Sequence, residues 1–263
     1  MPLRPFVIHE NTQHSLSGNA DRFMIILAAG MPRAGSGWHY NLVHDIVVAS
    51  GGQDARLIRR RFLLSPILTE VNCNIRSLST KRLAPVLVPS MLGNTFAIKT
   101  HSGPTPMALR LIQSKRMRVT YIYRDPRAAL LSAFEYGQRA RAAGRRNAFA
   151  RLETIEQAID FVKLYLRVWK QWTSLPSAHA MRYEDLLANY DAEAAKLAAF
   201  LKADPAKAAV KEAIEFYRSE KGAKGQHFQV GEAERFRETL TPGQLAAANE
   251  AFGPFLGEMG YQA

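Results

Sequence analysis

Apolar runs alternate with amphipathic segments along most of the chain. Short apolar runs bounded by glycine, proline or polar residues predict buried strands at 23–29, 95–99, 119–123 and 179–182. Apolar positions at helical spacing predict helices at 36–49, from 126 onward, at 154–173, 191–202 and 205–219, and from 241 onward. Pro66, Pro85 and Pro89 predict only short elements and loops between 51 and 92. Polar, irregular sequence predicts a loosely attached arm at 1–21 and a loop at about 221–240.

This alternation predicts an α/β fold with a parallel sheet flanked by helices in three layers. Four segments each follow a predicted strand, and they are 30–38, 100–103, 124–127 and 183–185. Because the carboxyl ends of parallel strands meet at one edge of a sheet, we expect these segments to form a single site.

Length and composition fit one globular domain over residues 1–263, with 47% hydrophobic and 22% charged residues. No apolar run is long enough to span a bilayer, and segment 1–22 lacks the apolar centre of a secretory signal. Cys73 is the only cysteine, which excludes an internal disulfide and a cysteine-based zinc site. We therefore expect a cytoplasmic protein, and an oligomer stays open.

The chain is strongly basic, with 35 Lys and Arg against 23 Asp and Glu and a formal net charge of +12. This balance favours anionic partners. The basic residues are scattered in short groups such as 59–61 and 115–118, and no zinc-finger spacing, RNP-like strand or long basic tail is present. We therefore expect no nucleic-acid partner, although a basic nucleic-acid-binding module remains an alternative.

The segment 23–38 (FMIILAAGMPRAGSGW) is an apolar run, a glycine-rich turn and a helix start, an arrangement that binds phosphate in α/β proteins. Gly30 and Gly35 have the Gly-x-x-x-x-Gly spacing of a Walker A loop. The Lys and Ser/Thr that should follow are missing, and residues 36–38 (SGW) stand there instead. The turn suits an anion but lacks the residues that hold a nucleoside triphosphate with magnesium, so a P-loop kinase or hydrolase is only an alternative.

Residues 32–38 read PRAGSGW, residues 99–101 KTH, residues 124–132 RDPRAALLS and residues 182–186 RYEDL. Together these four segments resemble the sulfotransferases that use 3′-phosphoadenosine 5′-phosphosulfate (PAPS). The first signature of that family reads Pro-Lys/Arg-Ser-Gly-Thr-Thr-Trp, and residues 32–38 (PRAGSGW) are similar to it. The family's Lys-Thr-His strand end is matched at 99–101. Its Arg-Asn/Asp-Pro-Lys/Arg segment, with a serine eight residues after the first arginine, is matched at 124–132, and its Arg-Tyr-Glu-Asp-Leu segment at 182–186.

The resemblance covers about residues 23–260. It implies a P-loop-like phosphosulfate-binding loop after the first strand, and PAPS as co-substrate without a metal. It also implies transfer of the sulfuryl group to an acceptor hydroxyl by in-line attack.

The resemblance also implies roles for particular residues. His101 is the expected general base, and Arg33 and Lys99 act on the transferring group. The expected donor-binding residues are Arg33, Gly35, Ser36, Gly37, Trp38, Arg124, Ser132, Tyr183 and Gly231. Among them, the backbone at 35–37 would hold the 5′-phosphate, Arg124 and Ser132 the 3′-phosphate, and Trp38 and Tyr183 the adenine. Phe216 and Tyr217 are both candidates for the other adenine face, and Glu70 and Glu135 are alternative bases.

Simpler interpretations of some of these residues stay open. Ser36 fits a helix N-cap, Trp38 a core position, and Arg124 an ion pair with Asp125 or Glu135.

The late loop departs from the family, which has Arg-Lys-Gly there. Either Lys221, Lys224, Arg235 or Arg237 supplies the charge missing around Gly231, or the 3′-phosphate is bound more weakly. For the acceptor we expect a pocket built by 51–92, 134–146 and the C-terminal loop. The expected acceptor is a small molecule or a carbohydrate, and an anionic acceptor stays open.

Overall fold

A computed structural model describes residues 24–218 and 234–262. The predicted arm at 1–21, Gly231, Lys221 and Lys224 lie outside the described residues. Within them, the strands are β1 (Ile25–Gly30), β2 (Asn74–Ile75), β3 (Phe96–Thr100), β4 (Met117–Tyr123) and β5 (Ala178–Arg182). The longer helices are α1 (Ser36–Ala49), α3 (Thr80–Met91), α5 (Pro126–Ala142), α6 (Ile155–Thr173), α8 (Tyr190–Phe200) and α12 (Pro242–Met259). The shorter ones are α2 (Ala55–Arg61), α4 (Pro106–Gln113), η1 (Phe149–Arg151), α7 (Tyr183–Ala188), α9 (Ala208–Phe216) and α11 (Phe236–Thr239).

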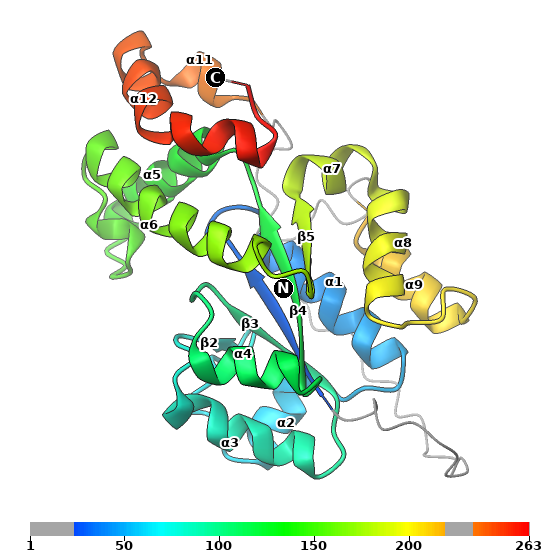
Figure 1. Ribbon diagram of the computed structural model, residues 1–263. Coiled ribbons are helices and arrows are strands. Elements are labelled where there is room, and N and C mark those ends of the chain that lie inside the picture. Colours follow the sequence, from blue (N-terminus) through cyan, green and yellow to red (C-terminus); the bar gives the residue numbers. More distant parts are fainter. Residues whose placement is uncertain (1–23, 219–233, 263) are drawn as a thin grey trace.

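The five strands form one parallel sheet in the order β2-β3-β1-β4-β5 (Figure 1). On one side α1 packs against β1, β3 and β4, and α9 packs on α1. On the other side α4 and α6 cover β4 and β5 (Figure 1). The three-layer α/β prediction is therefore confirmed.

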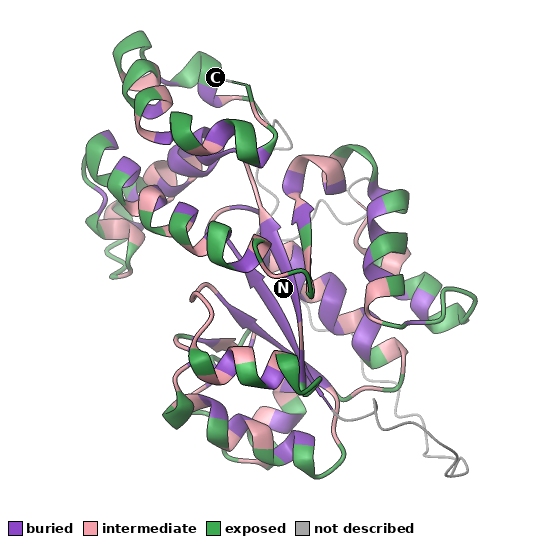
Figure 2. Cartoon of the chain, viewed as in Figure 1, coloured by how far each residue is buried: buried purple, intermediate pink, exposed green. Residues whose placement is uncertain are grey.

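The sheet is the centre of the core, and every residue of β1 and β3 is buried (Figure 2). Strands covered by helices on both faces are continuously apolar, and this is why the sequence pattern located them. Ala29 pairs with Thr100, Gly30 with Ile122, and Tyr123 with Arg182. This register brings the ends of β1, β3, β4 and β5 to one edge, where the four predicted site segments begin.

Several helix starts were predicted to within one residue. Helix α1 spans the predicted 36–49. Pro126 opens α5, and Asp125 caps it by accepting a hydrogen bond from the backbone of Arg127. Thr154 and Thr241 cap α6 and α12 with complete capping boxes.

The expectation of only short elements and loops at 51–92 is wrong, because α3 contains Pro85 and Pro89 in its interior. The two prolines are four residues apart, so the hydrogen bonds that they cannot make fall on one side of the helix. The loop expected at 221–240 also contains α11 near its end.

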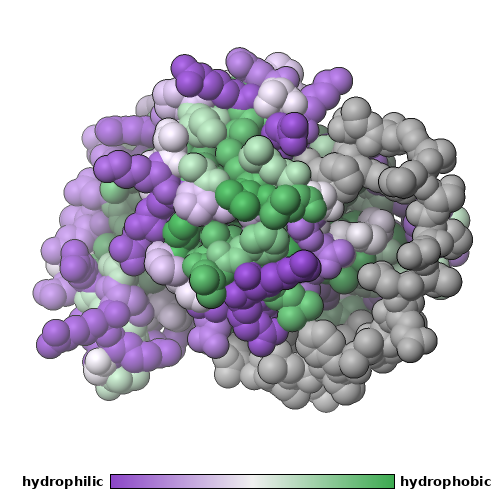
Figure 3. Space-filling model, turned by 90° about the horizontal axis from the view of Figure 1, so that it is seen from below, coloured by the Kyte–Doolittle hydropathy of each residue, from purple (hydrophilic) through white to green (hydrophobic). Residues whose placement is uncertain are grey.

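The face at the amino ends of the strands exposes apolar side chains, seen from below in Figure 3. Val88, Met91 and Leu92, at the end of α3, are among the exposed large apolar residues of the chain. None of them lines the cavity described below. Among the helices of the described ranges, none combines the length and apolar character needed to cross a membrane.

Candidate active site

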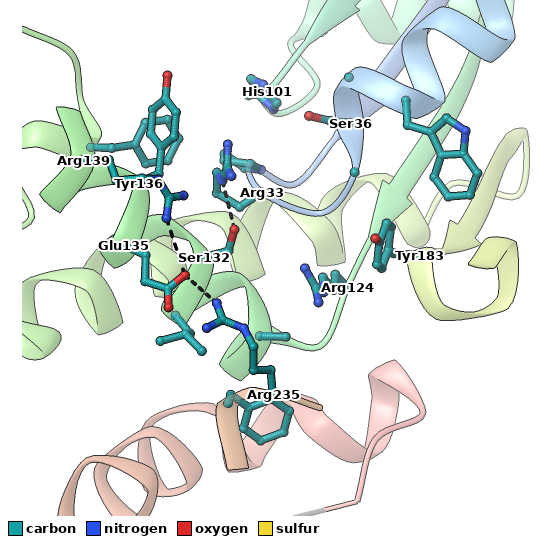
Figure 4. A pocket seen from close by; sticks show the side chains of 18 of the residues that line it. Arg33, Ser36, His101, Arg124, Ser132, Glu135, Tyr136, Arg139, Tyr183 and Arg235 are labelled. Atoms are coloured by element: carbon teal, nitrogen blue, oxygen red, sulfur yellow. Dashed lines mark hydrogen bonds and ion pairs between the residues drawn. The ribbon is translucent and has the colours of Figure 1, made fainter. Parts of the chain in front are cut away.

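A cavity of about 400 Å³ opens at the carboxyl ends of the strands. Ten residues predicted to bind the donor or to act on the transferring group line it, several of them labelled in Figure 4. These residues are Arg33, Gly35, Ser36, Gly37, Trp38, Lys99, His101, Arg124, Ser132 and Tyr183. They come from the loop after β1, from the ends of β3 and β4, from α5 and from the start of α7, so residues far apart in sequence converge as expected.

The loop between β1 and α1 leaves the amino end of the helix open toward this cavity. Gly35 is the N-cap, at φ 74°, and no side chain caps the helix. Ser36 is the first helical residue, so the interpretation of Ser36 as N-cap is wrong. The first backbone N–H groups of a helix have no partner within it, and they favour an anion. An added Cβ at Gly35 would lie 2.5 Å from Cδ2 of Tyr183, so glycine is required for both its backbone angle and this contact.

Arg33 lies at the centre of the cavity, also with a positive φ, of 65°. Its Nε donates a hydrogen bond of 3.2 Å to Oγ of Ser132. The Cζ atom of its guanidinium lies 4.6 Å from the ring centroid of Tyr136 and 5.9 Å from that of Phe149, which belongs to η1. Burial lowers the pKa of Arg33, yet an arginine remains a cation at neutral pH. The aromatic rings and Ser132 therefore hold a fixed positive charge in one place.

Lys99 supplies a second buried cation at the end of β3, where it is 5% exposed. Burial, followed by the positive charge of Arg33, lowers the pKa of Lys99 to about 8. Within the described residues, no carboxylate forms an ion pair with its ammonium group. A buried cation whose pKa is lowered by a neighbouring cation favours a bound anion nearby.

His101 directly follows β3, and its ring lies next to the end of β1. Its Nδ1 is 2.6 Å from the carbonyl oxygen of Gly30. Because a carbonyl can only accept, Nδ1 carries the proton and Nε2 keeps a free lone pair. Burial, followed by the charge of Lys99, lowers the pKa of His101 to about 4. The imidazole is therefore neutral at neutral pH and can accept a proton at Nε2.

Arg124 follows β4 and lies over the ring of Tyr183, 4.6 Å from its centroid. Among the described residues, the carboxylate of Glu184 lies within ion-pair range, at 3.9 Å from Nε of Arg124. Asp125 instead pairs with Arg127 at 2.8 Å, and Glu135 pairs with Arg235. The interpretation of Arg124 as an ion-pair partner of Asp125 or Glu135 is therefore not what the structure shows.

The aromatic end of the cavity is built around Trp38. The indole meets Tyr183 edge-on at 6.0 Å and stacks on Tyr190 at 5.9 Å. Its Nε1 donates to the backbone oxygen of Tyr217 at 2.9 Å. Neither Phe216 nor Tyr217 lines the cavity. The structure therefore assigns neither of them to the adenine position.

Sequence reasoning gave no site role to Phe149, which lines the opposite wall of the cavity. Asn72, Tyr136, Arg139 and Phe236 line the same wall and come from the segments expected to form the acceptor pocket. Glu135, one of the two alternative bases, also lines the cavity, where Arg235 binds it and Arg139 lies 3.9 Å away (Figure 4). Glu70, the other alternative base, is exposed and does not line the cavity. Glu135, Tyr136 and Arg139 follow Ser132 by one turn or two on α5, so they share its face of the helix.

Of the four candidates for the missing late-loop charge, the structure describes Arg235 and Arg237. Arg235 lines the cavity, whereas Arg237 is exposed and lies over the ring of Phe236. Of the residues expected to form the acceptor pocket, Asn72 is the contribution from 51–92 to the cavity lining. Arg59–Arg61 and Phe134 do not line it.

The order of these segments matches a family model described as the sulfotransferase domain, over residues 24–260. The chain belongs to the sulfotransferase family. No curated protein matches its sequence significantly. Among solved structures, the fold of this chain is similar to that of retinol dehydratase in complex with androsterone and the inactive cofactor PAP. The TM-score is 0.56 and the sequence identity is 17%, and the match covers 88% of this chain and 80% of that one.

Two further structures agree with this similarity. A complex of retinol dehydratase with retinol and PAP has TM-score 0.55 and 17% identity, over 89% of this chain and 81% of that one. The mouse sulfotransferase SULT7A1 complexed with PAP has TM-score 0.55 and 14% identity, over 88% of this chain and 84% of that one. At these identities the comparison establishes the shared fold.

Proposed function

We propose that this sulfotransferase transfers the sulfuryl group of PAPS to a hydroxyl group of its acceptor, with His101 as general base. The observation that carries the proposal is the cavity itself. Arg33, Lys99 and Arg124 converge there on the open amino end of α1, with a neutral His101 beside them. The structures similar to this chain contain PAP, the desulfated form of that donor.

The residues present fit such a donor. Burial, followed by neighbouring positive charge, lowers the pKa of Lys99, where the neighbour is Arg33, and burial also lowers the pKa of Arg33, with Arg139 and Arg124 acting in the same direction. A bound phosphosulfate would offset this repulsion between cations. The backbone N–H groups at 35–37 would hold the 5′-phosphate. Arg124 and Ser132 would hold the 3′-phosphate, since the Ser132 hydroxyl can accept from Arg33 and still donate to an anion.

The adenine would lie at the aromatic end of the cavity. Trp38 and Tyr183 line that end, and Arg124 connects it to the site proposed for the 3′-phosphate. Gly231 remains a proposed donor-binding residue outside the described residues. Arg235 is the described candidate for the late-loop charge, with Glu135 as its partner.

PAPS, when bound, supplies a sulfuryl group attached to a phosphate leaving group. His101 accepts the proton of the acceptor hydroxyl at Nε2 while its Nδ1–H stays bonded to Gly30. The fixed guanidinium of Arg33 stabilises the negative charge that grows on the leaving oxygen, and Lys99 does the same at the transferring group. Neither cation has to move far, because both are already held in the cavity.

The acceptor side is the wall of Tyr136, Phe149, Asn72 and Arg139. It combines aromatic rings with positive charge, which suits a hydroxyl-bearing small molecule or carbohydrate that carries an apolar or anionic part. Androsterone and retinol, found in the retinol dehydratase complexes, are hydroxyl-bearing molecules of this general kind.

Nucleotide binding tests the proposal. PAP in the presence of a chelator should raise the thermal midpoint, since a ligand at one hundred times its Kd stabilises a protein by about 2.7 kcal/mol. Arg124→Ala should remove most of that shift. Stabilisation by ATP with magnesium but not by PAP would contradict the proposal and favour a P-loop kinase or hydrolase.

A further inference from the structure

Residues 260–262, which follow α12, lie against the motifs that contribute Arg124 and Tyr183 to the cavity. The hydroxyl of Tyr261 donates a hydrogen bond of 2.7 Å to Oε2 of Glu184. The guanidinium of Arg182 lies over the ring of Tyr261 at 4.6 Å. Tyr261 is not part of the cavity lining, so its contacts reach the site only through these neighbours.

Glu184 connects Tyr261 to the strand end that carries Arg124. Its Oε1 accepts a hydrogen bond of 3.1 Å from the backbone N–H of Asp125 and lies 3.9 Å from Nε of Arg124. One carboxylate thus contacts the end of β4 with one oxygen and Tyr261 with the other. Glu184 itself stands in the first turn of α7, directly after Tyr183.

A second connection joins the same two regions. Arg127 is 1% exposed and makes two hydrogen bonds to the carboxylate of Asp125, at 3.1 and 2.8 Å. The same guanidinium donates to the backbone oxygen of Gln262 at 2.7 Å and to Oδ1 of Asn249 on α12 at 3.0 Å. Residues 124–127 are therefore fixed by hydrogen bonds to α12 and to the residues that follow it.

We propose that Tyr261 is a positioning residue for the nucleotide site, acting through Glu184 to keep the guanidinium of Arg124 directed at the 3′-phosphate. This inference rests on the proposed function. The carboxylate of Glu184 is shared among Tyr261, the Asp125 backbone and Arg124. Without the Tyr261 hydroxyl, the carboxylate of Glu184 loses one hydrogen-bond donor, and its negative charge draws Arg124 away from the cavity.

Tyr261 is suited to this role because it remains a donor. Burial, followed by the charge of Glu184, raises the pKa of Tyr261 well above its ordinary value. The hydroxyl therefore keeps its proton throughout the neutral and mildly alkaline range. Tyr261→Phe removes the hydroxyl, with its contacts to Glu184 and Arg182, and keeps the ring that packs under the Arg182 guanidinium.

The test compares the affinity for PAP with that for adenosine 5′-monophosphate, which lacks the 3′-phosphate. In Tyr261→Phe the Kd for PAP should rise about fivefold, at the low end of coupling between linked sites. The Kd for adenosine 5′-monophosphate should stay within about twofold of wild type, since Arg124 makes no contact with it. A role in general stability would weaken both nucleotides equally, and this result would overturn the inference.

Tyr217→Phe is the matched control. Its hydroxyl also donates to a carboxylate at 2.7 Å, that of Asp45, which belongs to α1 and does not contact Arg124. The ratio of the two affinities should be unchanged in this variant. In an Arg124→Ala background, Tyr261→Phe should have no further effect on the ratio, because the two residues act in one pathway.

Glu184→Gln tests the same connection if Tyr261→Phe does not fold. It should also lower the affinity for PAP relative to adenosine 5′-monophosphate, and an unchanged ratio would overturn the inference. A wild-type protein that binds both nucleotides equally would instead contradict the proposed 3′-phosphate site. The two failures are therefore distinguishable.

Discussion

Gly35→Ala adds a single carbon at the turn that opens the nucleotide cavity. The substitution has two separate costs. The backbone at Gly35 has φ 74°, which an alanine adopts at a cost of about 1–2 kcal/mol. The new Cβ would also lie 2.5 and 2.8 Å from two ring carbons of Tyr183.

The second cost cannot be avoided by a small rotation of Tyr183. Its side chain is 6% exposed, and the ring lies between Trp38 and the guanidinium of Arg124. Moving a packed ring typically costs a further 1–3 kcal/mol. We therefore expect the free energy of unfolding to fall by about 2–5 kcal/mol in total. We also expect weaker PAP binding, since Tyr183 and Arg124 both move.

Gly144→Ala separates the two costs. Gly144 follows α5 at φ 64°, and nothing lies within 4 Å of its added Cβ, so alanine there has the backbone cost alone. Chemical unfolding and calorimetric titration with PAP should be run on both variants. If Gly35→Ala loses no more stability than Gly144→Ala and binds PAP like wild type, the proposed contact between the loop and Tyr183 is refuted.

Three further variants test other parts of the site. Arg124→Ala should weaken PAP binding about tenfold or more by calorimetry, as a charge-assisted contact is typically worth about 1.5–3 kcal/mol; unchanged affinity would exclude Arg124 from the 3′-phosphate site. The pKa of Lys99 is about 8 without ligand, and a bound anion raises it. The affinity for PAP should therefore fall as pH rises through 8, and Lys99→Met should flatten this dependence. A wild-type affinity that is constant from pH 7 to 9 would contradict this. Arg127→Met leaves Asp125 buried without its partner and should lower the free energy of unfolding by about 3–5 kcal/mol in urea titrations; a loss below about 1 kcal/mol would show that the pair is not needed.

Local signals account for most of what the sequence predicted about the fold. Gly35, Pro126 and Thr154 mark helix starts by backbone angle or by capping, and these signals act within a few residues. The strands β1, β3 and β4 are mostly buried and mostly apolar, so they were found within two residues of their ends, whereas the two-residue strand β2 gave no such pattern and was missed. Pro85 and Pro89 do not end α3, because tertiary packing retains the helix despite two missing backbone hydrogen bonds.

The residues of the site likewise fall into those that a local sequence pattern predicts and those that it does not. Residues that directly follow a strand, such as His101 and Arg124, could be placed because parallel strands end at one edge. The contacts of Tyr261 with Glu184 and of Arg235 with Glu135 join positions 77 and 100 residues apart, and no local pattern indicates them. The state of His101 could not be predicted either, because burial and the bond to Gly30 determine its tautomer and its pKa.

The central claim is that this cavity transfers a sulfuryl group with His101 as the base. The most direct measurement is the transfer of radiolabelled sulfuryl from PAPS across a panel of hydroxyl acceptors, by wild type and by His101→Ala. His179→Ala is the control, since His179 lies on β5 outside the cavity. We expect His101→Ala to lower kcat by about 10²–10⁴-fold, with PAP affinity within about twofold of wild type, and His179→Ala to leave both unchanged. Transfer by His101→Ala at the wild-type rate, or no labelled product from wild type with any acceptor while PAP still binds, would contradict the account.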